Sequence, residues 1–202
     1  MHDRGAPLGE RLVQEALELL AREGLEGLSL RKLARRTGVS HNAPLRHFRS
    51  FKDLCSEVAA RGFALLSEAM RKAHDVLPPG AGPRARLAAS GRAYVHAAVE
   101  NPALFALMFR MDDLDSENMH FQRESAAAFE RLVGQIRAAQ DNGWRSEHDS
   151  RLLAGAAWAS FHGLASLWSQ QAFVGPVPGA TLDDALATTL DLVLSDPEGE
   201  PH

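Results

Sequence analysis

Residues 28–52 of this 202-residue chain read LSLRKLARRTGVSHNAPLRHFRSFK. The segment contains seven lysines and arginines and no acidic residue, although the whole chain has a formal net charge of -4. A cationic segment of this length in an acidic chain indicates a local binding site for a polyanion. The alternative is a solvated helix face, which is the commoner explanation for a run of charge.

Two short helical patterns joined by a Thr-Gly turn fill this segment. Ser29 and Ser40 are suitable N-terminal caps for helices that end near residues 36 and 48. Gly38 tolerates the positive φ that a tight turn between them requires. The pattern predicts a helix-turn-helix, in which the first turn of the second helix meets base edges in the major groove of DNA.

The first turn of that second helix carries side chains that can read bases. Asn42 can pair with adenine through two hydrogen bonds, and His41 can donate to guanine or to a phosphate. The cations that follow would meet phosphates, and helix N-termini would assist them. On the residues alone, the predicted DNA contacts are Ser40, His41, Asn42, Ala43, Arg46, Arg49 and Lys52.

Pro44 is an unusual residue within this second helix. If Ser40 is the cap, Pro44 falls at the fourth helical position and removes one backbone hydrogen bond. We therefore expect the helix either to begin later or to kink at this residue.

The charge is distributed unevenly along the chain. Residues 1–52 have a net charge of +4, and the remaining 150 residues have a net charge of -8. This asymmetry predicts a small DNA-facing module on a larger body that does not contact DNA.

The single cysteine, Cys55, excludes an intramolecular disulfide and fits a reducing compartment. No apolar run has the length of a signal peptide or a membrane span, so we expect a cytoplasmic location and no membrane partner.

Apolar residues recur at helical spacing throughout, and no long stretch alternates in the manner of a strand. We therefore predict an all-α chain of about nine helices. Beyond the first helix, which ends at Gly24, they are expected at about residues 29–36, 40–48, 50–77, 84–100, 102–109, 119–141, 149–173 and 181–195.

Residues 23–54 closely resemble the N-terminal domain of the TetR family of one-component transcriptional regulators. The stretches GRAYVHAAVENPALFALMF and WASFHGLASLW resemble the subgroup of that family named for a Trp-His-Gly (WHG) signature, with Phe161-His162-Gly163 in its place. The resemblance implies that Arg31 contacts a base or a phosphate and that His47 contacts a phosphate.

Two positions depart from the family pattern. Leu45 replaces a tyrosine that commonly binds phosphate, and Phe51 replaces a lysine that commonly does so. Both changes remove phosphate contacts, so we expect DNA affinity to be weaker and less dependent on salt than is typical.

The resemblance also implies the domain organisation. Residues 1–52 would form the helix-turn-helix DNA-binding domain, residues 53–195 a helical domain for effector binding and dimerisation, and residues 196–202 a disordered tail. Two long helices near the C-terminus would form the dimer contact. Small residues recur every four positions in one, and an apolar stripe marks the other. The predicted dimer residues are Gly155, Ala159, Gly163, Leu182, Leu186, Leu190 and Val193. Alternatively, both helices pack within one protomer.

The implied ligand pocket rests on aromatic, methionine and leucine side chains, which also suit an ordinary core. A mostly apolar cavity with a few polar anchors fits a hydrophobic or aromatic small molecule. The candidates are Phe63, Leu66, Met70, Tyr94, Phe105, Met108, Phe109, Phe121, Phe129, Trp158, Phe161 and His162. No histidine or carboxylate lies four residues from His162, and no catalytic motif is present, so we predict no metal, no cofactor and no enzymatic site.

The sequence therefore predicts a homodimeric repressor that binds a palindromic operator in double-stranded DNA and is released by a small hydrophobic ligand. Movement of the long helix that follows the DNA-binding segment would change the spacing of the two heads. One alternative is a helical small-molecule-binding protein or enzyme with a degenerate DNA-binding head, which the departures at Pro44, Leu45 and Phe51 favour. Another is a DNA-binding protein without an effector.

Overall fold

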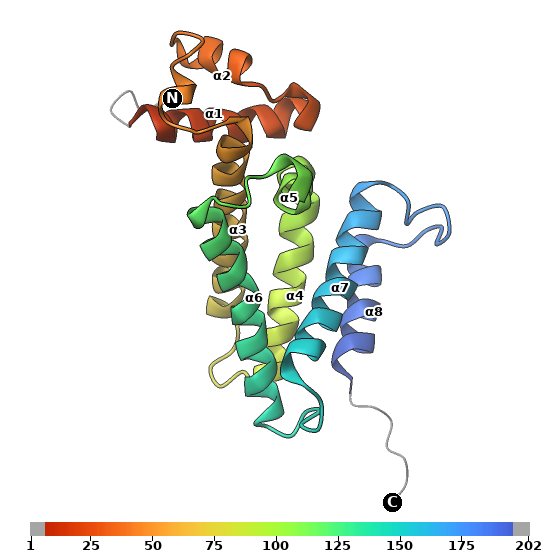
Figure 1. Cartoon of the computed structure of the whole chain (residues 1–202). Helices are drawn as coiled ribbons and strands as arrows, with labels where there is room; N and C mark the ends of the chain where they lie inside the picture. The colour runs from red at the N-terminus through yellow and green to blue at the C-terminus, as the bar shows by residue number, and fades with distance from the viewer. Residues whose placement is uncertain (1–6, 196–202) are drawn as a thin grey trace, which may run out of the picture. The chain divides into compact units, whose positions relative to one another are not determined.

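The computed structural model describes residues 7–195, and every regular element in that range is helical (Figure 1). The predicted all-α class is confirmed, with eight α-helices in the described range in place of about nine. They are α1 (Leu8–Glu23), α2 (Leu30–Thr37), α3 (Phe51–Asp75), α4 (Pro83–Glu100), α5 (Pro102–Phe109), α6 (Met119–Gln140), α7 (Ser150–Ser169) and α8 (Leu182–Leu194). Short 3₁₀ turns occur at η1 (Leu25–Gly27), η2 (Pro44–Arg46) and η3 (Met111–Asp113).

The helix predicted at residues 40–48 is wrong. A turn at residues 41–43 leads instead into the single 3₁₀ turn η2. In an α-helix capped by Ser40, the N–H of residue 44 would make the first bond to the Ser40 carbonyl, and proline has no N–H. The Ala43 N–H bonds that carbonyl instead, at 3.0 Å, which closes a tighter turn.

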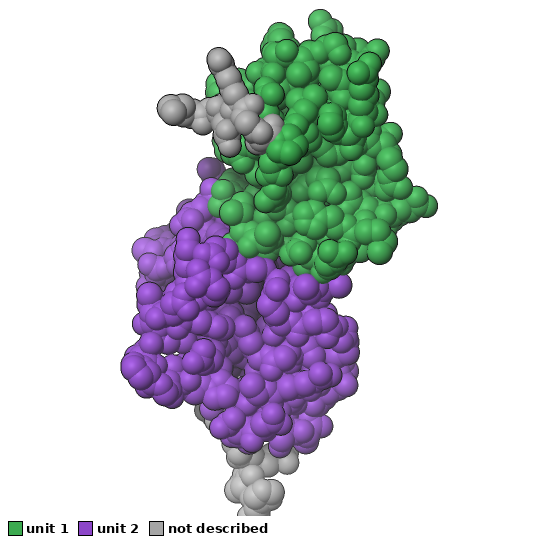
Figure 2. All heavy atoms as spheres, turned by 90° about the vertical axis from the view of Figure 1, so that its left-hand side faces the viewer, with its two compact units in different colours: residues 1–65, 101–125 green, residues 66–100, 126–202 purple. Residues whose placement is uncertain are grey.

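The chain divides into two compact units (Figure 2). Unit 1 comprises Met1–Leu65 and Asn101–Ser125, and unit 2 comprises Leu66–Glu100 and Ala126–His202. The domain boundary expected after residue 52 stays a prediction. The tail expected to be disordered, residues 196–202, lies outside the described residues. No helix in the described part of the chain is long and apolar enough to cross a membrane.

The core of unit 1 is built by the apolar faces of its helices. Leu12 and Leu19 of α1 are fully buried, as are Leu33 of α2 and Leu54 and Val58 of α3. Hydrogen-bonded caps fix where α2 and α3 begin, because the hydroxyl groups of Ser29 and Ser50 accept backbone N–H groups. These bonds are Lys32 N to Ser29 Oγ at 3.3 Å and Asp53 N to Ser50 Oγ at 3.1 Å.

Unit 2 packs α4, α7 and α8 together. The C-terminal end of α8 is capped by donors from elsewhere in the unit. Arg84 and Trp144 donate to the Leu194 carbonyl at 2.7 and 3.1 Å, and Arg145 donates to the Ser195 carbonyl at 3.1 Å. These bonds satisfy carbonyl groups that a helix end leaves without intrahelical partners.

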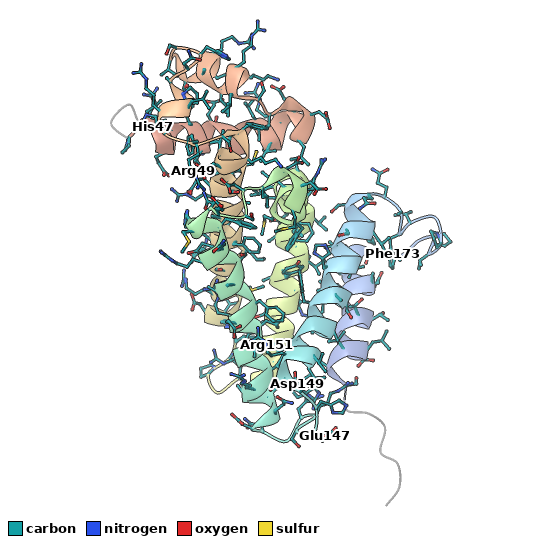
Figure 3. All side chains as sticks on the ribbon, viewed as in Figure 1. His47, Arg49, Glu147, Asp149, Arg151 and Phe173 are labelled. Carbon is teal, nitrogen blue, oxygen red and sulfur yellow. The ribbon has the colours of Figure 1, made fainter. Side chains whose placement is uncertain are left out.

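The other helix boundaries in unit 2 follow local capping chemistry. α8 begins with a capping box, in which Thr181 and Asp184 bond each other's backbone N–H groups. α7 was expected to continue to residue 173 but ends at Ser169, since Gln171 adopts a positive φ of 57° that a right-handed helix does not allow. Phe173 therefore lies in the connection to α8 (Figure 3).

Gly91 of α4 sits where α7 and α8 approach closely. A methyl group at this position would lie 2.7 Å from the Phe161 ring and 3.1 Å from a methyl group of Leu190, and both of those side chains are buried. We expect Gly91→Ala to lower the free energy of unfolding by about 1–3 kcal/mol, despite the better helix propensity of alanine. Urea unfolding followed by circular dichroism measures this.

A matched control for this substitution is available on α6. A methyl group added at exposed Gly134 would meet no described atom within 4 Å, so Gly134→Ala should stabilise the chain by up to about 1 kcal/mol. Equal effects of the two substitutions would contradict the close packing at Gly91.

Candidate nucleic-acid interface

A left-handed glycine fixes the turn after α2. Gly38 has φ 71° and ψ 30°, and its N–H bonds the carbonyls of Ala34 and Arg35. Thr37 donates its hydroxyl to the Leu33 carbonyl at 2.8 Å, so both residues of the predicted Thr-Gly turn are held. Leu33 and Ala34 are buried and direct this end of α2 onto the core. The turn predicted at Gly38 is confirmed, and residues 40–42, which follow it closely, are exposed.

The segment after the turn is anchored on one side and exposed on the other. Pro44 and Phe48 are buried, and the Phe48 N–H bonds the Pro44 carbonyl at 3.0 Å. His47 lies beside the start of α1, where a methyl group at Gly9 would be 3.8 Å from its ring (Figure 3). The structure places the predicted DNA contacts at the surface, with Ala43 half-buried. The exposed ones are Arg31, Ser40, His41, Asn42, Arg46, His47, Arg49 and Lys52.

Two cations of the basic segment pair with acidic residues of α1. Lys32 bonds Glu23, and this hydrogen bond holds the pKa of the Glu23 carboxyl below its ordinary value. Arg36 bonds Glu15, which raises the pKa of the Arg36 guanidinium. Glu15 is only 1% exposed, so the Arg36 guanidinium compensates a carboxylate that is buried in unit 1.

A third cation, Arg49, is held by residues that precede α6. Its guanidinium lies 2.9 Å from Asp115 and 3.4 Å from Glu117, and its backbone N–H bonds Asp53 at 2.9 Å (Figure 3). Asn118 also donates to Asp53, at 2.8 Å. The phosphate contact suggested for Arg49 from sequence therefore competes with three carboxylates of its own unit.

The remaining four cations of the basic segment form no ion pair with any residue between 7 and 195. They are Arg31, Arg35, Arg46 and Lys52, and all four are exposed. Their charge is therefore available to a polyanion such as the DNA backbone. The sequence of the segment alone suggests seven cations available to DNA. The fold pairs three of them, Lys32, Arg36 and Arg49, with acidic residues that lie outside the segment.

Two family models together match most of the chain. Residues 12–58 match the bacterial regulatory proteins of the TetR family, and residues 87–193 match the tetracycline repressor-like C-terminal domain. The second match alone spans more than half of the chain. The chain belongs to the TetR family. In this TetR-family chain, the first match includes the Gly38 turn and the exposed residues that follow it.

Solved structures share the fold of this TetR-family chain. A protein with unknown function from Rhodococcus sp. RHA1 is 32% identical over 95% of both chains, with a TM-score of 0.81. The TetR family transcriptional regulator PfmR from Thermus thermophilus is 23% identical over 94% of this chain and 100% of its own, with a TM-score of 0.66. A putative TetR-family regulator from Rhodococcus sp. is 20% identical over 93% of this chain and 98% of its own, with a TM-score of 0.69. No match was found among curated protein sequences.

The predicted ligand-pocket residues of this TetR-family chain fall into two groups, one in each unit. In unit 1 the Phe63 ring contacts Phe109 and Phe121, with centroids 5.7 and 6.1 Å apart, and Phe105 contacts Phe109 at 5.1 Å. Met108 lies beside Gly62, where an added methyl group would be 2.5 Å from its sulfur. The unit 2 group contains Leu66, Met70, Tyr94, Phe129, Trp158, Phe161 and His162.

A short hydrogen-bonded chain links three of the unit 2 residues. Trp158 Nε1 donates to Tyr94 Oη at 3.0 Å, and Tyr94 Oη lies 2.9 Å from His162 Nδ1. Burial raises the pKa of the Tyr94 hydroxyl and lowers the pKa of His162, so both groups are neutral near pH 7. These hydrogen bonds join members of an aromatic cluster that includes Phe129, whose ring centroid lies 6.1 Å from that of Trp158.

The predicted dimer residues differ in their exposure. Methyl groups added at Gly155 and Gly163 would meet no described atom within 4 Å, and Ala159 is exposed. By contrast, Leu186 and Leu190 are 1% and 4% exposed, because they pack inside unit 2. A second copy could bury almost no further area on these two leucines. Leu182 and Val193 are half-buried.

Proposed function

We propose that this TetR-family chain is a homodimeric repressor that binds a palindromic operator and leaves it when a small hydrophobic ligand binds. The observation that carries the DNA-binding part is the exposed face of the basic segment, residues 28–52. It combines Asn42 and His41, which can read bases, with four cations that have no acidic partner in the described chain.

Fluorescence anisotropy tests the DNA-binding part directly. DNA from the promoter region beside the gene for this chain is titrated with protein at two salt concentrations. We expect tight, salt-sensitive binding that an Arg31→Ala/Asn42→Ala double variant abolishes. Weak binding that neither substitution changes would refute the proposal. It would favour the alternative in which the helical body acts as a small-molecule carrier or an enzyme.

The exposed cation Arg46 gives a quantitative form of this test. We expect Arg46→Ala to weaken binding to all DNA sequences alike and to reduce the slope of log K against log salt by about 0.9, because one phosphate contact is lost. Arg71→Ala is the matched control, since Arg71 is an exposed arginine on α3 that pairs with Glu68 and Asp75. An unchanged salt slope in Arg46→Ala would show that Arg46 does not contact a phosphate.

The α7 surface supports a dimer. Gly155, Ala159 and Gly163 recur every four residues, so they lie along one face of the helix and permit close approach of another helix. Leu152 and Leu167 are exposed at the two ends of the same helix, as is Leu192 on α8. Apolar side chains of this size at the surface favour burial against a second copy. Two-fold symmetry would then present two heads to an inverted repeat.

The aromatic cluster around Tyr94, Trp158 and His162 supports an effector site in unit 2. We assign the C-terminal half to the WHG subgroup, with Phe161-His162-Gly163 in place of its signature. A site with these residues would suit a hydrophobic or aromatic compound held by a few polar groups. Addition of such compounds to the anisotropy assay should release the DNA. If no compound class changes DNA affinity or melting temperature, the effector part of the proposal fails.

A further inference from the structure

Leu45 is a large apolar side chain on the surface that carries the predicted DNA contacts. It is 52% exposed, in the middle of the 3₁₀ turn η2. A single exposed leucine is common in proteins and has no meaning by itself. Leu45 is informative because the residues around it in sequence are the predicted DNA contacts.

The backbone of residues 44–48 defines which side of the turn faces outward. Pro44 and Phe48 are both buried, so the edge that they share faces the core of unit 1. Residues in a 3₁₀ turn are about 120° apart, so Leu45 and Arg46 both point away from the side that Pro44 buries, and both are exposed. Asn42 precedes Leu45 by three residues, in the turn that leads into η2, and it is exposed as well. Leu45 is thus exposed in the same short segment as a base-reading amide and an arginine without an acidic partner in the described chain.

We propose that Leu45 determines operator specificity by contacting the 5-methyl group of a thymine in the major groove. The inference rests on the proposed DNA-binding function. A leucine side chain has no donor or acceptor, so it cannot read a base edge by a hydrogen bond. The thymine methyl group is the apolar feature that the major groove offers to such a side chain.

The charges around Leu45 select DNA over an apolar protein surface as the partner. The exposed cations Arg46 and Lys52 lie within seven residues of it in sequence, and neither pairs with an acidic residue of the described chain. An apolar protein surface would have to remove these charges from water without compensation. A polyanion compensates them while Leu45 is buried against a base.

Replacement of thymine by deoxyuridine tests the proposal, because it removes only the methyl group. An operator is first obtained by in vitro selection, and each thymine is then replaced in turn. We expect at least one replacement to weaken binding of the unsubstituted protein by about fourfold, the effect of exposing one methyl-sized group. Leu45→Ala and Leu45→Gln should bind the thymine and uracil forms of that site equally.

Leu65→Ala is the matched control, because Leu65 is 54% exposed and lies on α3 of the same unit. It should keep the thymine preference of the unsubstituted protein. If the thymine-to-uracil ratio is the same in Leu45→Ala as in the unsubstituted protein at every position, the role of Leu45 is refuted and DNA binding stands. If the protein selects no DNA at all, the proposed function fails and this inference fails with it.

Discussion

Replacement of Asn118 by alanine is expected to lower the free energy of unfolding by about 3 kcal/mol. Asn118 is only 5% exposed, and its side chain makes three hydrogen bonds in unit 1. Its amide nitrogen donates to Asp53 at 2.8 Å and to Glu57 at 2.9 Å. Its amide oxygen accepts the Phe121 N–H at 2.8 Å, which caps the first turn of α6.

The effect is large because alanine would leave the hydrogen-bond partners of Asn118 unpaired. Asp53 is buried and would lose a donor to one carboxylate oxygen, and α6 would lose its N-terminal cap. A buried group left without its partner costs more than the bond contributed, because the group was already removed from water. Asn118→Asp should also destabilise the chain, since it would place a carboxylate beside those of Asp53 and Glu57.

Urea unfolding followed by far-ultraviolet circular dichroism measures the Asn118 effect. Asn142→Ala is the matched control, because Asn142 is exposed and its side chain makes one bond, to the Ala138 carbonyl at 2.9 Å. We expect this control to change the free energy of unfolding by less than about 1 kcal/mol. Similar losses in the two variants would show that the buried network does not stabilise the fold.

Local chemistry made the caps and the turn around α2 predictable. Ser29 and Gly38 act through hydrogen bonds and dihedral angles that span only a few residues, so the sequence pattern was sufficient. The same reasoning raised the difficulty at Pro44 but did not resolve it. Whether a proline at the fourth position kinks a helix or prevents it depends on whether the flanking residues are anchored elsewhere. Here the burial of Pro44 and Phe48 favours a short turn over a helix.

The pairing of charges could not be read from the basic segment itself. Arg36 meets Glu15 from 21 residues away, and Arg49 meets Asp115 from 66 residues away. A count of charges along the sequence identifies a cationic segment but does not show which cations the fold neutralises. The exposed set at Arg31, Arg35, Arg46 and Lys52 emerged only when the segment was folded against α1 and residues 115–117.

Helical periodicity likewise finds apolar faces without showing what covers them. The stripe on α8 was expected to face a second copy, yet Leu186 and Leu190 are covered within unit 2. Leu190 packs beside Gly91 of α4, a contact that no pattern within α8 reveals. The small-residue face of α7 is different, because the positions of Gly155 and Gly163 have open space around them in the described chain. The case for a dimer therefore rests on α7 more than on α8.

Gly163→Arg should convert the protein from a dimer into a monomer and weaken operator binding by about 100-fold or more. The first carbon of a side chain at residue 163 has room in a single chain, since a Cβ there would meet no described atom within 4 Å. The arginine side chain would, however, occupy the space into which the partner helix must pack. A monomer presents one head at a time, so it loses the gain in affinity that two linked heads provide.

Sedimentation equilibrium and operator anisotropy on the same samples measure both effects. Gly134→Arg is the matched control, because Gly134 is an exposed glycine in the middle of α6 with equally open surroundings in the described chain. Gly134→Arg introduces the same charge and also replaces a glycine within a helix, but residue 134 is not part of α7. We therefore expect the Gly134→Arg variant to stay dimeric. A Gly163→Arg variant that stays dimeric would place the interface elsewhere. A monomeric variant with full operator affinity would mean that one head is sufficient for binding, and the palindromic operator would lose its rationale.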